Sequence, residues 1–81
     1  MTVRVLLFGS EAIAAGRGTV EVELPDGQGC AHLRRALVAA YPALGPFADQ
    51  ARFAINSEFA PLDAPIRAGD EVALIGLVSG G

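Results

Sequence analysis

The sequence predicts an α+β fold in which one main helix is laid across a small sheet. Three segments lead to this prediction. Residues 19–24 alternate apolar and polar side chains, which is typical of a strand with one buried face. Residues 30–41 carry apolar side chains at helical spacing, and residues 71–75 form an apolar strand near the end of the chain. Because 81 residues leave room for one core, we expect a single domain over residues 1–81.

The first half of the chain begins with two expected strands separated by a short helical piece. Residues 2–8 form a strand with apolar side chains on both faces, whereas residues 19–24 have one apolar face. Between them, residues 10–15 are compatible with a short helix and residues 16–18 with a flexible turn. The inward faces of the two strands are expected to carry Val3, Val5, Leu7, Val20, Val22 and Leu24.

The main helix is expected over residues 30–41, where Cys30, Leu33 and Leu37 share the apolar side. It ends before Pro42, because proline lacks an amide donor and disfavours helix in the residue before it. Residues 43–50 contain a further glycine and proline, so they form at most a turn or a short second helix.

The remaining strands are short. Residues 52–56 and 58–60 are expected to be strands around an Asn56-Ser57 turn. Gly69, which adopts positive φ without strain, lies in the turn that leads into the last strand, residues 71–75.

Composition excludes several classes of protein. The chain is 52% hydrophobic and 19% charged, with a net charge of -3, which is typical of a folded domain. Beyond Arg34 and Arg35 there is no basic cluster, so we expect no nucleic acid partner. The longest apolar run covers residues 36–41, and a membrane span needs about 20 residues, so we expect no membrane. With one cysteine there is no intrachain disulfide, and we expect a cytoplasmic protein.

Side chains suited to catalysis are sparse. His32 is the one imidazole, and on a helix between Ala31 and Leu33 it is interpreted as a surface residue. Cys30 lies on the apolar side of the same helix, where a thiol behaves as a small hydrophobe. One cysteine and one histidine do not make a zinc site. We therefore expect no bound metal or cofactor.

The end of the chain is the strongest functional signal. Residues 76–81 belong to no expected element and are interpreted as a flexible tail. Six extended residues reach about 20 Å, which is enough to enter the active site of another protein. Gly80 and Gly81 have no side chains, so a narrow channel would admit the terminal carboxylate.

Several segments resemble the MoaD/ThiS family of sulfur carriers, and within it the MoaD branch, the small subunits of molybdopterin synthase. The resemblance covers nearly the whole chain. Its most specific part is the block GDEVALI at residues 69–75, followed by VSGG at the end of the chain. Weaker similarities lie in FG after the first strand, LPDG before the helix, and AIN with Glu58. The resemblance implies a β-grasp, ubiquitin-like fold with a mixed sheet.

The resemblance also implies a function without catalytic side chains in the chain itself. A ubiquitin-activating-type adenylyltransferase would consume ATP to adenylate the carboxylate of Gly81, next to Gly80, and a sulfurtransferase would convert the adenylate into a thiocarboxylate. The tail would then enter the large subunit of molybdopterin synthase, which supplies the catalytic groups and uses the sulfur for the dithiolene of molybdopterin.

Other functions remain open at this point. One is a carrier for another thiocarboxylate pathway, such as thiamin thiazole synthesis, although residues 9–18 make the first connection longer than is usual there. Another is a ubiquitin-like protein modifier joined to lysine through Gly81. A third is a structural domain with an incidental tail. Two departures bear on the partner. Gly76-Leu77 stands where family members commonly have Pro-Pro, and Ser10-Glu11-Ala12-Ile13 stands where many members carry an Arg-Glu or Arg-Asp pair.

A partner surface is expected on the side of the sheet away from the main helix. The first and last strands carry apolar side chains on both faces. A domain this small has no second helix to cover the side away from the main helix, so apolar side chains there would be exposed. The alternative is that residues 43–50 fold over and bury this side. The residues expected to bind partners are Phe8, Phe59 and Ile75 on the sheet and Leu77, Val78 and Ser79 in the tail.

Overall fold

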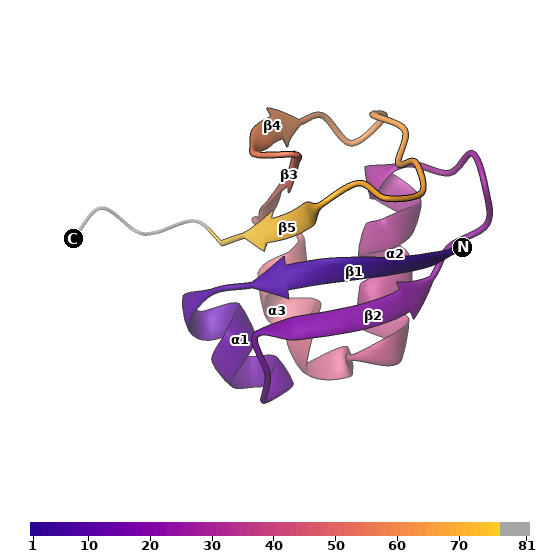
Figure 1. Cartoon of the computed structure of the whole chain (residues 1–81). Coiled ribbons are helices and arrows are strands. Elements are labelled where there is room, and N and C mark those ends of the chain that lie inside the picture. The colour runs from indigo at the N-terminus through magenta and orange to yellow at the C-terminus, as the bar shows by residue number, and fades with distance from the viewer. Residues whose placement is uncertain (77–81) are drawn as a thin grey trace.

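The computed structural model describes residues 1–76 of the chain, and residues 77–81 lie outside the described part. The described residues form a five-stranded sheet in the order β2-β1-β5-β3-β4 (Figure 1). The strands are β1 (Thr2–Leu7), β2 (Thr19–Glu23), β3 (Arg52–Ile55), β4 (Glu58–Ala60) and β5 (Val72–Ile75).

The sheet is mixed. The first and last strands, β1 and β5, pair in parallel at its centre, with Leu7 opposite Leu74. The pairs β1–β2, β3–β5 and β3–β4 are antiparallel. This strand order, with one main helix across a single side, is the β-grasp arrangement, so the predicted fold class is confirmed.

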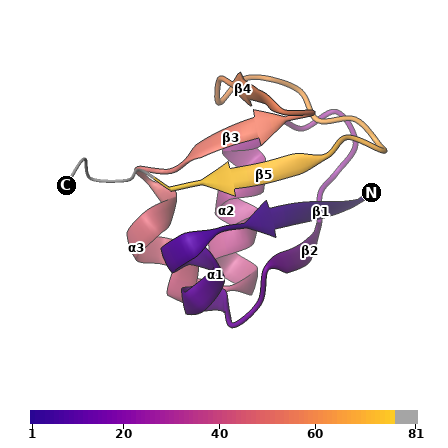
Figure 2. The ribbon, with the colours of Figure 1, turned by 60° about the vertical axis from the view of Figure 1, so that its left-hand side comes forward.

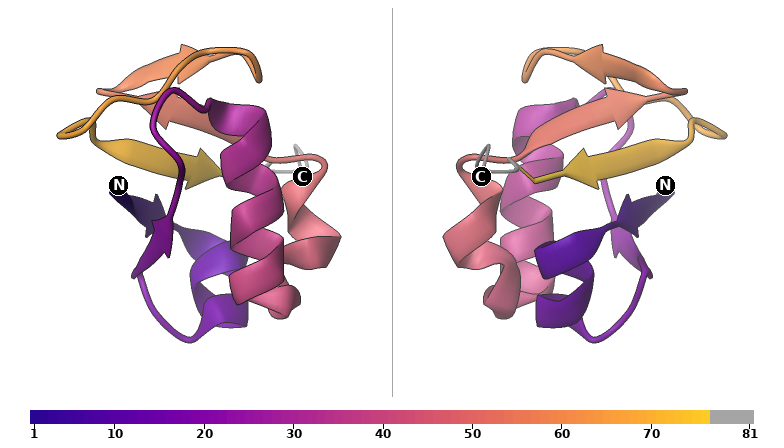
Figure 3. Two further views of the ribbon diagram at one scale, coloured as in Figure 1. Left: turned by 90° about the vertical axis from the view of Figure 1, so that its right-hand side faces the viewer. Right: turned by 90° about the vertical axis from the view of Figure 1, so that its left-hand side faces the viewer.

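All helices of the described residues lie on one side of the sheet (Figure 2). The main helix α2 crosses that side, and the shorter helices flank it (Figure 3). The segment that contains the 3-10 turn η1 and helix α3 packs beside α2. The alternative that residues 43–50 cover the other side of the sheet is therefore wrong. The bounds are α1 (Gly9–Ala15), α2 (Cys30–Ala40), η1 (Pro42–Leu44) and α3 (Gly45–Ala48).

The core lies between the sheet and α2. Phe53 of β3 and Leu33 and Leu37 of α2 are almost completely buried. Their positions fit the repeat of two residues in a strand and of about 3.6 residues in a helix. Full burial of each such side chain contributes about 1.5–3 kcal/mol to the free energy of folding. The other members of the buried cluster are Val3, Val5, Leu7, Val20, Val22, Leu24, Cys30, Leu44, Ala51, Ile66, Val72 and Leu74.

Contacts with the connection before β5 hold the start of α2. Gly29 caps the helix without a side-chain hydrogen bond, so other groups must accept from the first amides. The N–H of Cys30 donates to the carbonyl of Ala64 over 3.1 Å, and that of Ala31 to Leu62 over 2.9 Å. A Cβ at position 29 would lie 2.5 Å from the carbonyl oxygen of Ala64, so this close approach requires glycine.

A polar network holds the start of β5 against the β3–β4 turn. Asn56 and Ser57 have φ of 52° and 70°, as a two-residue hairpin turn requires. The Asn56 amide donates to Asp70 over 3.0 Å and accepts from the N–H of Glu71 over 3.0 Å. The N–H of Arg67 donates to the Asp70 carboxylate, and this bond, followed by that from Asn56, lowers the pKa of Asp70. The carboxylate therefore stays ionised to a lower pH than an ordinary aspartate, and its hydrogen bonds hold the turn.

Within residues 1–76, no helix is both long enough and apolar enough to cross a membrane.

Candidate functional site

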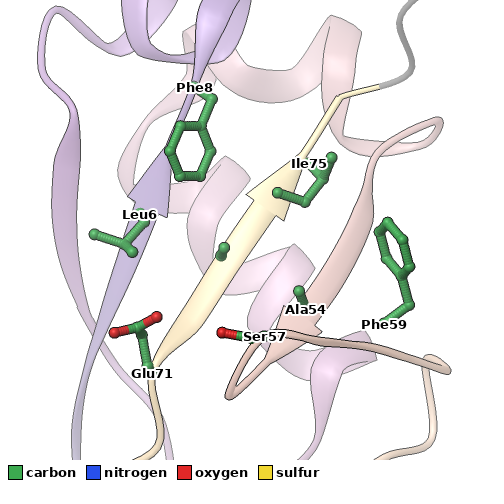
Figure 4. Close-up of a pocket in the computed structure, with 8 residues that line it drawn as sticks. Leu6, Phe8, Ala54, Ser57, Phe59, Glu71 and Ile75 are labelled. Carbon is green, nitrogen blue, oxygen red and sulfur yellow. The ribbon is translucent and has the colours of Figure 1, made fainter.

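An apolar hollow with a volume of about 300 Å³ lies on the side of the sheet away from the helices (Figure 4). Its side chains come from β1, β3, β4 and β5 and from the chain beside these strands. Phe8 and Phe59 are each more than half exposed, at 52% and 59%. The lining residues are Leu6, Phe8, Ala54, Ser57, Phe59, Glu71, Ala73 and Ile75.

The alternation of side chains along the two central strands creates this hollow. Leu7 of β1 and Leu74 of β5 point to the helices and are buried, whereas their neighbours Leu6 and Ile75 point to the hollow. Both faces of the central strands carry apolar side chains. Only one face is packed against helices, because no described helix covers the other. Contiguous exposed apolar surface of this kind is typical of a site for protein binding.

The hollow has a polar end and an apolar end. Glu71 and Ser57 lie together at one end, and Phe8 and Ile75 lie toward the other, where β5 ends (Figure 4). At the edge of the sheet, the guanidinium carbon of Arg52 lies 4.4 Å from the centre of the Phe59 ring. This cation–π contact orients the ring.

The structure brings three of the predicted partner-binding residues together, since Phe8, Phe59 and Ile75 all line the hollow. Their role in binding stays a prediction. Ile75 is the last residue of β5, and the predicted tail begins at the next residue, Gly76, so the hollow adjoins its root. The other predicted site residues lie outside the described part of the chain: Leu77, Val78, Ser79, Gly80 and Gly81.

Sequence reasoning missed Glu11. It is 6% exposed, and it is the one buried charged residue among residues 1–76. Its carboxyl group lies against Gly76, directly after β5. The sequence pattern of a glutamate in a short helix predicts a side chain exposed to solvent. Glu11 and Gly76 come together only through the parallel pairing of β1 with β5. No signal in the sequence alone would have found this contact.

The described residues do not assemble a set of catalytic groups. Cys30 is fully buried, and burial raises the pKa of its thiol, although a backbone hydrogen bond acts in the opposite direction. A buried thiol with a raised pKa is a poor nucleophile. His32 is partly exposed on α2, on the other side of the sheet from the hollow. Residues 1–76 contain no group of three or more potential metal-binding side chains.

Replacing Cys30 with alanine is expected to cost about 1 kcal/mol of unfolding free energy, because a buried sulfur leaves a small cavity. Chemical denaturation measures this cost. Any sulfur uptake by the parent should persist in the folded variant, as seen in its intact mass. Complete loss of uptake in a well-folded Cys30→Ala protein would instead place the sulfur chemistry on this thiol.

Comparisons with known proteins show what this chain is similar to in sequence and fold. Residues 5–81 match the ThiS family. A molybdopterin synthase sulfur carrier subunit from Chlamydomonas reinhardtii is 37% identical, with each chain covered completely. One from Mycobacterium tuberculosis is 36% identical over 98% of this chain and 96% of its own. The solved structure of small archaeal modifier protein 1 from Haloferax volcanii has a TM-score of 0.85 and 33% identity, covering 95% and 98% of the two chains.

Proposed function

The chain belongs to the ThiS family of small sulfur carriers, and from this premise we propose that it carries sulfur as a thiocarboxylate on Gly81 for the synthesis of molybdopterin. Both curated relatives are named as the sulfur carrier subunit of molybdopterin synthase and match over nearly their full length. The structural observation that carries the proposal is the open apolar hollow that ends at Ile75, where the tail begins.

Activation of the terminal carboxylate explains why the chain needs no catalytic side chain. A carboxylate is a poor electrophile, so an activating enzyme first joins it to the AMP portion of ATP and releases pyrophosphate. The outer sulfur of a persulfide on a sulfurtransferase then attacks the acyl carbon, and AMP leaves. A thiol reductant cleaves the S–S bond of the resulting acyl disulfide, which frees the thiocarboxylate of the carrier and leaves the thiol joined in a disulfide. In this scheme ATP is consumed by the activating partner, and the carrier supplies the acyl group and a surface for docking.

The hollow and the tail have different roles in this proposal. We assign docking to the hollow, whose apolar side chains a partner would cover, and delivery to the tail, which enters the partner's active site. The proposed partners are an adenylyltransferase of the ubiquitin-activating type, a sulfurtransferase and the large subunit of molybdopterin synthase. The large subunit would supply the groups that transfer sulfur to the pterin precursor.

Incubation with an activating enzyme, ATP and a sulfurtransferase tests the proposal. The intact mass should rise by the difference between sulfur and oxygen, and the loaded protein should support molybdopterin formation with a large subunit. A chain that never gains sulfur from systems that load a known carrier would refute the sulfur-carrier role. A chain that gains sulfur but delivers it only to thiazole synthesis would refute the molybdopterin assignment.

A protein modifier is the second candidate, favoured by the 33% identity to small archaeal modifier protein 1. In that role the Gly81 carboxylate would end in an isopeptide bond to a lysine of a target protein. The protein has no lysine, so a second copy cannot be attached to one of its lysine side chains to form a polymer of modifiers. Mass spectrometry of host proteins distinguishes the roles, because a modifier leaves a Gly-Gly remnant on lysine and a dedicated carrier is recovered with a free thiocarboxylate.

A further inference from the structure

Glu11 occupies an unusual place for a charged residue. It lies in the first turn of α1 and is 6% exposed. Burial of a carboxylate costs free energy unless polar groups surround it. What its carboxyl group touches is the backbone at the end of β5, at Gly76.

The parallel pairing of β1 and β5 creates this contact. Parallel strands end at the same edge of a sheet, and Leu7 is the partner of Leu74. One or two residues further on, β1 leads into α1, and β5 leads into Gly76. The first turn of α1 and the root of the tail are thus neighbours although they are 65 positions apart (76 − 11) in the chain.

A side chain at position 76 would have to displace the carboxyl end of Glu11. A Cβ at this position would overlap Oε1 of Glu11 and would lie 2.6 Å from its carboxyl carbon and 2.7 Å from Oε2. Unlike Gly9, Gly16, Gly27 and Gly69, residue 76 does not have positive φ, so a side chain there would conflict with the Glu11 carboxyl group and not with its own backbone conformation. Gly18 provides the contrast, because it also lacks positive φ but a Cβ there would have no atom within 4 Å.

We propose that Glu11 is a positioning residue that fits against Gly76 and sets the direction in which the tail leaves β5. This inference rests on the proposed function, since the direction matters where the carboxylate of residue 81 must reach a reacting group. Docking through the hollow does not involve Glu11, which is not among the lining residues.

Four variants test the inference: Gly76→Ala, Glu11→Ala, the double variant, and Gly18→Ala as a matched control. Gly76→Ala should lower the rate of sulfur loading about tenfold or more, because misplacement of a reacting group is costly. Removing the Glu11 side chain as well should raise loading to the level of Glu11→Ala alone, since the added methyl group then has room. Gly18→Ala should load at the parent rate.

Glu11→Ala alone should lower kcat for loading several-fold with little change in KM, because docking is preserved. Glu11→Gln, which keeps the shape of the side chain, should lose less than Glu11→Ala. A merely structural role would instead lower the melting temperature with no selective effect on kcat.

The double variant is decisive. If Gly76 is needed because the partner's channel admits no Cβ, the double variant will be as slow as Gly76→Ala or slower, and the inference is overturned. Parent-like loading by Gly76→Ala would overturn it too. A readout without partners separates this question from the proposed function: NMR should show a nuclear Overhauser effect between the Glu11 Hγ and Gly76 Hα protons. If that contact is present but the parent is never loaded, the proposed function fails and the contact stands; if it is absent, the inference fails.

Discussion

Deletion of Gly81 is expected to abolish sulfur loading while leaving the melting temperature nearly unchanged. The deletion leaves a glycine carboxylate at the end of the chain, because Gly80 becomes the last residue. It shortens the reach of the tail by about 3.3–3.6 Å. Since a misplacement of about 1 Å at a reacting group costs about a hundredfold in rate, this loss of reach is prohibitive. Intact mass after incubation with the activating system measures the loading.

The stability of the truncated protein separates reach from folding. The buried apolar residues of the described part lie between Val3 and Leu74, so loss of residue 81 removes nothing from that core. Thermal unfolding should therefore match the parent. Gly81→Ala is the matched variant, because it keeps the length of the tail and adds one methyl group. Failure of both variants indicates a narrow channel as well as a required length, whereas sulfur uptake by the truncated chain at the parent rate would contradict the assignment of Gly81.

Replacement of Phe59 with glutamate is expected to weaken binding of the large subunit by about 2–4 kcal/mol, or roughly 30-fold to 1,000-fold in Kd. The ring lines the hollow and is 59% exposed in the free chain, so a partner would bury it. A glutamate removes this apolar area and places a charge in the interface, where it must lose its hydration. Isothermal titration calorimetry with the purified large subunit measures the change.

The isolated fold should tolerate the same substitution. An exposed side chain contributes little to packing, and loss of the contact with Arg52 costs about 0.5–1 kcal/mol. Ile13→Glu is the matched control, because Ile13 is 82% exposed but lies on α1 and does not line the hollow. It should bind the large subunit like the parent. If Phe59→Glu unfolds the protein, or binds as tightly as the parent, the hollow is not the docking surface.

Most of the elements could be predicted from local pattern. Along β2, Val20 and Val22 alternate with Glu21 and Glu23, and only a strand with one buried face fits this period of two. In α2 the buried side chains recur at helical spacing, as predicted. The ends of the elements were less exact. The first strand, for example, ends at Leu7 instead of Phe8, because Phe8 already precedes the first turn of α1.

The fold class had a second source in the sequence. The pattern of elements predicted a sheet with a helix across it, but not which strands are neighbours. The β-grasp fold with a mixed sheet entered through the resemblance of residues 69–75 and the Gly-Gly end to a known family, and the structure gave the order with β1 beside β5. Pairing between strands 65 or more residues apart leaves no local trace, because the residues that meet share neither a turn nor a helical face.

The sequence by itself determined three properties of this protein: two terminal residues, Gly80 and Gly81, without side chains, the absence of lysine, and a length that leaves room for one core. These are properties of composition and position, which do not depend on folding. Only the tertiary structure decided that the helices all gather on one side and leave Phe8, Phe59 and Ile75 around an open hollow. It also decided that Glu11 is buried against Gly76. The hollow and the contact between Glu11 and Gly76 both depend on which strands pair and which side of the sheet the helices cover. Strand pairing and helix placement are fixed together when the whole core is buried.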